Sequence, residues 1–190
     1  MRISLRTFLP VLMLAAALAA AAKAKEPVDY VNPYIGNISH LLVPTFPTVQ
    51  LPNSMLRVYP ERGDYTSEYV RGLPVIVTNH RERSAFNLTP SQRSVPASVI
   101  EYNYDNEHIT PYSYSTDLDD NTMHADYSPA HQAGVYGISF SPGKPVYISL
   151  TSRNGRMTVD GAAASGYQDL DERKHVYVYA ECDAAPVNAG

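Results

Sequence analysis

The sequence of 190 residues contains no tryptophan and only one cysteine, Cys182. A single cysteine cannot form an internal disulfide, which excludes a disulfide-stapled scaffold, and we expect Cys182 to be a small buried residue of the core. Basic residues are in the minority, because 15 lysines and arginines stand against 19 aspartates and glutamates. The formal charge of −4 argues against a protein that binds the phosphate backbone of nucleic acids. The hydrophobic content of 44% argues against disorder.

Long apolar runs are also scarce, and the clearest one stands at the N-terminus. It covers residues 8–22, follows two arginines and ends at Ala22-Lys23-Ala24, which fits a signal-peptidase site. With a proline inside, the run is shorter than the roughly 20 apolar residues that a membrane-spanning helix needs. The sequence therefore predicts a signal peptide over residues 1–24, no membrane span, and an exported protein of the periplasm, the cell surface or the medium.

Residues 25–190 show little helical spacing, and alternation of apolar and polar residues is the main pattern. We expect strands in the runs 112–118, 123–127, 136–140, 146–150 and 176–182. Residues 141–145 and the pair Asn154 and Gly155 fit turns between antiparallel neighbours, the latter a tight hairpin turn. The prediction is an all-β protein, a single antiparallel β-sandwich domain over residues 25–190.

The first part of this domain differs, because six prolines interrupt residues 32–83. We expect long loops there, and long ordered loops often carry binding groups on a rigid scaffold. Motifs for chemistry are weak throughout the chain. Asp117, Asp119 and Asn121 match the start of a calcium-binding loop, but later positions of that loop do not match, so we predict an acidic turn between two strands. No zinc spacing, nucleophile elbow or phosphate-binding loop is present, and the sequence predicts no catalytic or metal-ligating residue in this chain.

Several blocks of the sequence resemble one known family. Residues 29–36 (Asp-Tyr-Val-Asn-Pro-Tyr-Ile-Gly) are similar to the opening of the N-terminal domain of glycoside hydrolase family 92, whose members are mainly exo-acting α-mannosidases of bacteria. Further similarity lies in residues 40–60, with their Pro-Thr-Phe-Pro, in 104–114, and in 134–136 with 150–155. The resemblance covers most of residues 28–183.

The resemblance implies a fold and different roles for two domains. In this family the N-terminal β-sandwich packs on a helical (α/α)6 barrel, and the active site lies between the two. The reaction is calcium-dependent and inverts the anomeric centre, and the helical domain supplies most catalytic and calcium-binding residues. These 190 residues would then be the N-terminal portion of an exported α-mannosidase-like enzyme, structural and substrate-shaping but not catalytically competent alone. Its expected partners are the helical domain of the same polypeptide and a mannose-containing glycan, and calcium is implied only for the full-length enzyme.

His80 and Arg62 are the candidates for substrate binding, because both are polar residues of the Pro-rich loops and could hydrogen-bond sugar hydroxyls. The alternative for each is a structural role in pinning a loop. The alternative for the whole chain is a stand-alone secreted carbohydrate-binding or adhesin-like β-sandwich that uses surface tyrosines. A third possibility is a complete enzyme, which requires a pair of carboxylates converging within this chain.

Overall fold

The computed structural model describes residues 24–38, 41, 45–62, 66–76, 85–93 and 99–188. The chain divides into two compact units, residues 1–31 and residues 32–190. In the first unit, Pro27–Tyr30 form a short 3-10 helix, η1, whose start is closed by a hydrogen bond from the Glu26 backbone N–H to the Asp29 carboxylate, 2.8 Å. The predicted signal peptide lies outside the described residues apart from Ala24. Among the helices described, none has the length and apolar character to cross a membrane.

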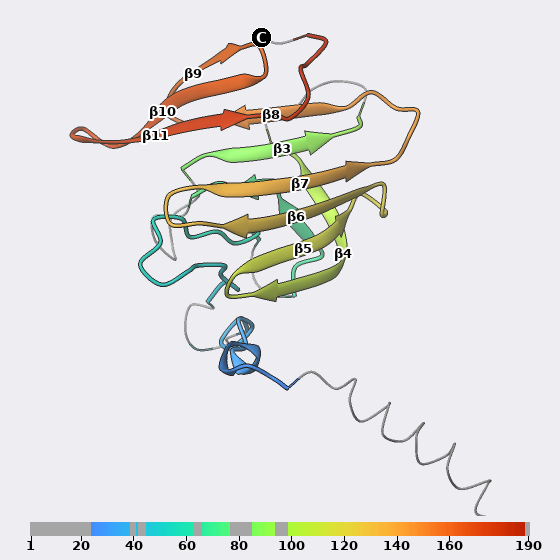
Figure 1. The fold of residues 1–190 in the computed structure, drawn as a ribbon, viewed down its shortest axis with the longest axis vertical. Helices are drawn as coiled ribbons and strands as arrows, with labels where there is room; N and C mark the ends of the chain where they lie inside the picture. Colours follow the sequence, from blue (N-terminus) through green and yellow to red (C-terminus); the bar gives the residue numbers. More distant parts are fainter. Residues whose placement is uncertain are drawn as a thin grey trace, which may run out of the picture. The chain divides into compact units, whose positions relative to one another are not determined.

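The described strands of the second unit form three antiparallel sheets, drawn in Figure 1. The five-stranded sheet has the order β1 (Tyr69–Arg71), β4 (Glu101–Thr110), β5 (Ser113–Leu118), β6 (Met123–Pro129) and β7 (Gly134–Phe140). The second sheet has the order β2 (Leu73–Pro74), β3 (Asn87–Ser91) and β8 (Tyr147–Thr151). The third sheet has the order β11 (Lys174–Glu181), β10 (Ala163–Asp171) and β9 (Gly155–Asp160). The all-β antiparallel prediction is confirmed.

Alternation along the strands explains why they pack. In β5 and β6 every second side chain is buried and the ones between are not, as a half-buried strand requires. The inward set is Tyr114, Thr116, Leu118, Met123, Ala125 and Tyr127. This sheet is one wall of the larger core, which also contains Val49, Leu73 and the partly buried Leu88. The Tyr102 hydroxyl of β4 donates to the Pro90 carbonyl of β3 at 2.5 Å, which ties the first sheet to the second.

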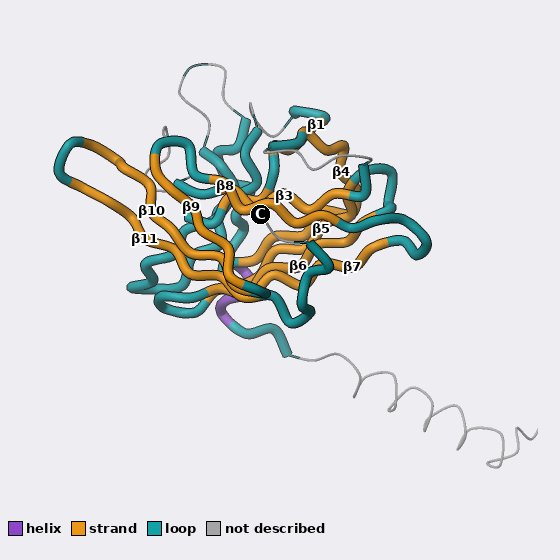
Figure 2. Tube along the Cα trace, turned by 90° about the horizontal axis from the view of Figure 1, so that it is seen from above, coloured by secondary structure: helices purple, strands orange, loops and turns teal. Residues whose placement is uncertain are grey.

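A second, smaller core lies beneath the third sheet. It is built on Ile76 and Phe86, and Leu150 of β8 packs against it together with Val176 and Val178 of β11. One face of the third sheet is therefore covered, and alternation turns the other face away from this core. The tip of the β10–β11 hairpin projects beyond the other strands in both views (Figures 1 and 2).

Two turn predictions are wrong in the same way. The Asn154 and Gly155 pair does not close a hairpin, because β8 and β9 belong to different sheets, and residues 141–145 likewise carry the chain from the first sheet to the second. Gly155 is needed for another reason: a Cβ at this position would collide with the Tyr167 carbonyl oxygen on β10. The hairpin turn of this region is at Gly161, whose φ of +58° favours glycine.

The prediction for Cys182 is also wrong, since its side chain is exposed. It would share the packed face of β11 with Val176 and Val178, but it lies one residue beyond the end of the strand. The smaller core does not reach that far. The prediction of long loops in the Pro-rich half is confirmed for the residues described there, which contain only β1, β2 and an isolated bridge between Val49 and Val58.

Candidate functional site

Arg62, the candidate sugar contact within the described residues, is buried in an ion pair. Its guanidinium Nη1 lies 3.0 Å from Oε1 and 3.1 Å from Oε2 of Glu107. The Arg62 side chain has no exposed surface, and that of Glu107 is 7% exposed. Arg62 thus joins a Pro-rich loop to strand β4. Its contact with a sugar stays a prediction, and the other candidate, His80, lies outside the described residues.

A β-bulge in β4 aims Glu107 at Arg62. Tyr102 and Tyr104 point inward, and regular alternation would place Asn106 inward next. The pairing with β5 shifts between Asp105 and His108, and Asn106 adopts a φ of +52°. This extra residue reverses the alternation, so that Glu107 faces inward instead.

Aromatic residues surround the ion pair. The Arg62 guanidinium carbon lies 5.3 Å from the centre of the Tyr104 ring, a favourable cation–π distance. The Tyr114 hydroxyl donates to Glu107 Oε1 at 3.4 Å, and the Tyr34 hydroxyl donates to the Glu107 carbonyl at the same distance. Burial raises the pKa of the Glu107 carboxyl, against the opposing effect of Arg62. Burial likewise raises the pKa of the Tyr114 hydroxyl, which stays protonated as a donor.

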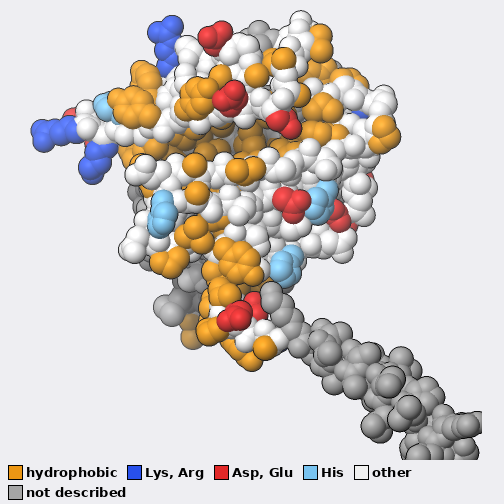
Figure 3. All heavy atoms as spheres, viewed as in Figure 1, with side chains coloured by type: hydrophobic (Ala, Val, Ile, Leu, Met, Phe, Trp, Pro, Cys, Tyr) orange, Lys and Arg blue, Asp and Glu red, His pale blue; other side chains and the backbone are white. Residues whose placement is uncertain are grey.

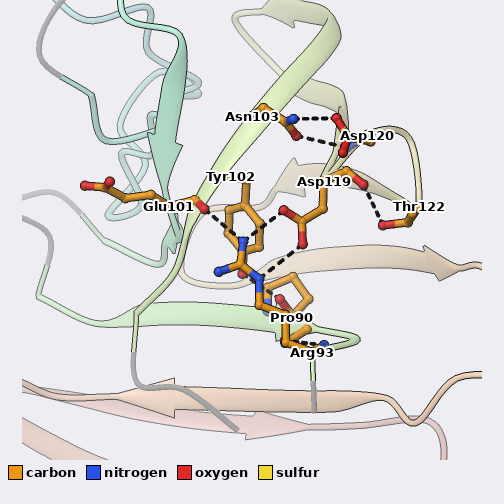
Figure 4. A network of polar contacts seen from close by, with 9 residues as sticks. Pro90, Arg93, Glu101, Tyr102, Asn103, Asp119, Asp120 and Thr122 are labelled. Carbon is orange, nitrogen blue, oxygen red and sulfur yellow. Dashed lines mark hydrogen bonds and ion pairs between the residues drawn. The ribbon is translucent and has the colours of Figure 1, made fainter. Parts of the chain in front are cut away.

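Of the calcium-like pattern, Asp119 and Asn121 lie in the turn between β5 and β6, and Asp117 belongs to β5; Figure 4 shows Asp119 with its neighbour Asp120. Asp119 accepts from Arg93 Nη2 at 2.9 Å, and Asp120 accepts from Asn103 Nδ2 at 2.6 Å. The Thr122 hydroxyl closes the turn by donating to the Asp119 carbonyl at 2.7 Å. These carboxylates are engaged with different partners and do not converge. Across the described residues, no group of three or more His, Cys, Asp or Glu side chains could hold a metal ion.

A polar row on the outer face of β5 and β6 escaped the sequence analysis. His124 Nδ1 lies 2.6 Å from Asp117, and its Nε2 lies 3.3 Å from both Asp126 and Ser115. The hydrogen bond with Asp117 is the main cause of a raised pKa for His124. The carboxylates beside both ring nitrogens favour the protonated form of His124, which makes it poorly suited to act as the base for Ser115. Period-two spacing puts all four residues outward, but only the pairing of the strands brings them together.

Beside this row lies an open hollow of about 350 Å³. Its walls include small outward residues of three neighbouring strands, Ser115 of β5, Ser128 of β6 and Gly137 of β7. The carboxylate of Asp126 is the charged group among its lining residues. The hydroxyls can donate hydrogen bonds to a small polar ligand or accept them from it, and the carboxylate can accept them. These groups do not form a nucleophile paired with a general base.

Several buried polar atoms have no hydrogen-bond partner among the residues described, and two groups stand out. One is the side-chain amide of Asn37, which is 2% exposed in the loop after Gly36. The other is the Tyr127 hydroxyl on the inner face of β6. Burial raises the pKa of Tyr127 to about 12, so this hydroxyl is neutral at ordinary pH. Unpaired polar groups of this kind cost stability.

Comparison with known proteins gives a consistent result. Residues 30–190 match the glycosyl hydrolase family 92 N-terminal domain. Two solved structures of the family GH92 α-mannosidase from Bacteroides thetaiotaomicron have the same fold as this chain. The first aligns with a TM-score of 0.69 and 18% identity over 86% of this chain and 27% of that enzyme. The second, in complex with mannoimidazole, aligns with a TM-score of 0.65 and 17% identity over 85% and 26%. No curated protein sequence matches.

Proposed function

Since this chain belongs to the glycosyl hydrolase family 92 N-terminal domain family, we propose that it is the N-terminal β-sandwich portion of an exported α-mannosidase-like glycoside hydrolase. The observation that carries the proposal is the family match, which extends over residues 30–190. The chain spans about a quarter of the length of the α-mannosidase whose fold it shares. The rest of the enzyme, including the helical (α/α)6 domain, is proposed as its partner within the same polypeptide.

The proposed role is structural and substrate-shaping, without catalysis by this chain alone. A glycosidase needs two carboxyl groups on either side of the scissile bond, one of them free to give or take a proton. The carboxylates of Glu107, Asp117 and Asp119 instead bind Arg62, His124 and Arg93. They stabilise loops and turns, which supports a scaffold more than a catalytic centre.

The proposed substrate is a mannose-containing glycan held between the sandwich and the helical domain. His80 and Arg62 are its proposed contacts on this chain, and Arg62 becomes available only when its pair with Glu107 opens. Calcium is proposed for the full-length enzyme, where it would assist the inverting hydrolysis. We propose that the calcium ligands come mainly from the helical domain.

The test begins with the DNA downstream of the Gly190 codon. We expect an open frame that continues into a helix-rich domain. The product of the continuous frame should release mannose from an aryl α-mannoside in the presence of calcium, and the purified 190-residue chain should not. A stop codon directly after the Gly190 codon would refute the hypothesis that this product is part of an enzyme. Hydrolysis by the 190-residue chain alone would refute the proposal that catalysis requires a second domain.

The alternative function is a stand-alone secreted carbohydrate-binding or adhesin-like sandwich. Its supporting observation is the set of tyrosines that stand largely exposed on the surface, among them Tyr177 and Tyr179. A stable monomer that binds glycan, together with a stop codon after Gly190, would favour this alternative.

A further inference from the structure

The outward face of the third sheet carries three tyrosines, which we call the tyrosine face: Tyr167 of β10 with Tyr177 and Tyr179 of β11. Their exposed fractions are 37%, 75% and 67%. On β11 these tyrosines alternate with Val176 and Val178, which pack on the smaller core. The aliphatic residues therefore lie on the inner side of the sheet and the aromatic residues on the outer side.

The pairing of the strands gathers the rings. Tyr167 is directly opposite Tyr177, and the two ring centres are 6.2 Å apart. His175 joins them, with its ring edge-on to Tyr167 at 6.1 Å and 6.5 Å from Tyr177. Contacts of this kind restrict the rotation of each ring, so a ligand that stacks there finds the surface already formed.

Hydrogen-bonding groups alternate with the rings. His175 Nδ1 bonds to Asp169, the Tyr179 hydroxyl donates to Glu181 at 3.3 Å, and Arg156 is directly opposite Tyr167 on the other side of β10. A second row carries hydroxyls, since Thr158 and Ser165 lie 3.3 Å apart. In Figure 3, side chains of the hydrophobic class, in which tyrosine is included, gather over this sheet, with basic side chains at the projecting hairpin tip.

We propose that the tyrosine face is a binding platform for the pyranose rings of a neutral glycan. A pyranose presents C–H groups on its face and hydroxyls around its edge, which suits exposed aromatic rings bordered by donors and acceptors. The mixed charge of Arg156, Asp169 and Glu181 does not favour a polyanion. A protein partner would need a dry apolar centre, whereas the hydroxyl-bearing Ser165 and Thr158 continue the cross-strand row of Tyr179 on this face. The platform goes beyond the hydrolase proposal, because it requires neither hydrolysis nor a second domain, and it deepens the alternative function above by naming the surface that binds the glycan.

The test is affinity electrophoresis of the purified chain in native gels that contain a soluble α-mannan or dextran. We expect migration to be retarded by at least one of the two polymers. Tyr177→Ala and Tyr179→Ala should each weaken the apparent affinity at least fivefold. Tyr177→Phe should retain binding, because the ring remains. Tyr69→Ala, which removes a tyrosine of 54% exposure from the first sheet, is the matched control and should bind as the parent chain does.

Each contrary outcome is distinct. Migration unaffected by both polymers would overturn the proposal, and so would alanine variants that bind as tightly as the parent chain. A dimer in size-exclusion chromatography that Tyr177→Ala dissociates, in a chain that neither polymer retards, would identify the face as a protein interface instead. All of these readouts are independent of mannosidase activity, so the proposed function stands or falls separately.

Discussion

Replacing Arg62 should destabilise the fold, because it leaves the Glu107 carboxylate buried without a compensating positive charge. The two side chains lie 3.0 Å apart at their nearest atoms and are almost wholly shielded from water. Unit charges about 4 Å apart attract by about 4 kcal/mol at an effective dielectric constant of about 20. Breaking a buried pair by removing one partner costs about 3–5 kcal/mol. We expect Arg62→Met and Glu107→Leu each to lower the free energy of unfolding by about that amount at neutral pH.

The double variant Arg62→Met/Glu107→Leu should behave differently, because it leaves no buried charge and keeps similar volume. A buried ion pair replaced by apolar residues is often neutral. The double variant should therefore be within about 1–2 kcal/mol of the parent chain. Urea unfolding followed by circular dichroism measures all four proteins, and a constant denaturant slope is required for the comparison. The coupling between the two sites is then the difference from additivity.

Two results would refute this account. Single variants that cost less than about 1 kcal/mol would mean that water screens the pair as at a surface. A double variant that costs the sum of the two would mean that the residues do not interact. The Arg93–Asp119 pair is the internal control, because its side chains are 48% and 25% exposed and Arg93→Met should cost little. The penalty of Arg62→Met should also shrink as the pH falls through the pKa of Glu107, which burial raises.

Three further predictions concern other parts of the fold. Tyr127→Phe removes a buried hydroxyl that no described residue binds and should leave stability unchanged or raised by about 1 kcal/mol, measured by urea unfolding. The raised pKa of His124 means that its contribution to stability is complete below its ordinary pKa of about 6.5 and is lost as the pH rises through the higher folded value. Asp117→Asn should move that pKa back toward the ordinary value in an NMR titration of the His124 ring, with a stability effect below about 1 kcal/mol at this exposed site. Gly155→Ala forces a Cβ against the neighbouring strand and should cost about 1–3 kcal/mol in a thermal melt.

Control substitutions test the physical reason behind each of these three predictions. Tyr102→Phe removes a hydroxyl that does have a partner and should cost about 0.5–1.5 kcal/mol, so equal effects at Tyr102 and Tyr127 would contradict the argument. Gly137→Ala places a Cβ no nearer than 3.8 Å to its neighbour and should be mild, unlike Gly155→Ala. A His124 pKa that does not respond to Asp117→Asn would rule out the hydrogen bond between them as the cause of the shift.

Strands β5, β6, β7, β8 and β11 could be predicted from the sequence because each one alternates locally, whereas β3, β4, β9 and β10 were not predicted. Tyr114, Thr116 and Leu118 all point inward, as their spacing requires. The sheet to which each strand belongs could not be predicted, because that depends on pairing with distant residues. Asn154 and Gly155 illustrate the limit: the dipeptide is typical of a hairpin, yet its neighbours enter different sheets. The dipeptide alone does not tell whether its glycine forms a tight turn or allows two strands to approach closely.

The candidate site was less accessible to sequence reasoning. Arg62 and Glu107 are 45 residues apart in the chain and meet only through the bulge at Asn106. The reversal of alternation between Tyr104 and Ile109 was a readable sign of that bulge. The burial of Arg62 left no local sign, since an arginine among prolines and acidic residues is typical of a surface loop.

Strand β11 also affects the tendency of the chain to aggregate. In the described sheet it is an edge strand, and residues 176–180 read Val-Tyr-Val-Tyr-Ala, with no charge, proline or glycine. A short run of high β-propensity along an open edge is a template for intermolecular cross-β growth. Lys174 and Glu181 flank the run as charged gatekeepers, and their removal should hasten the conversion of concentrated protein into fibrils.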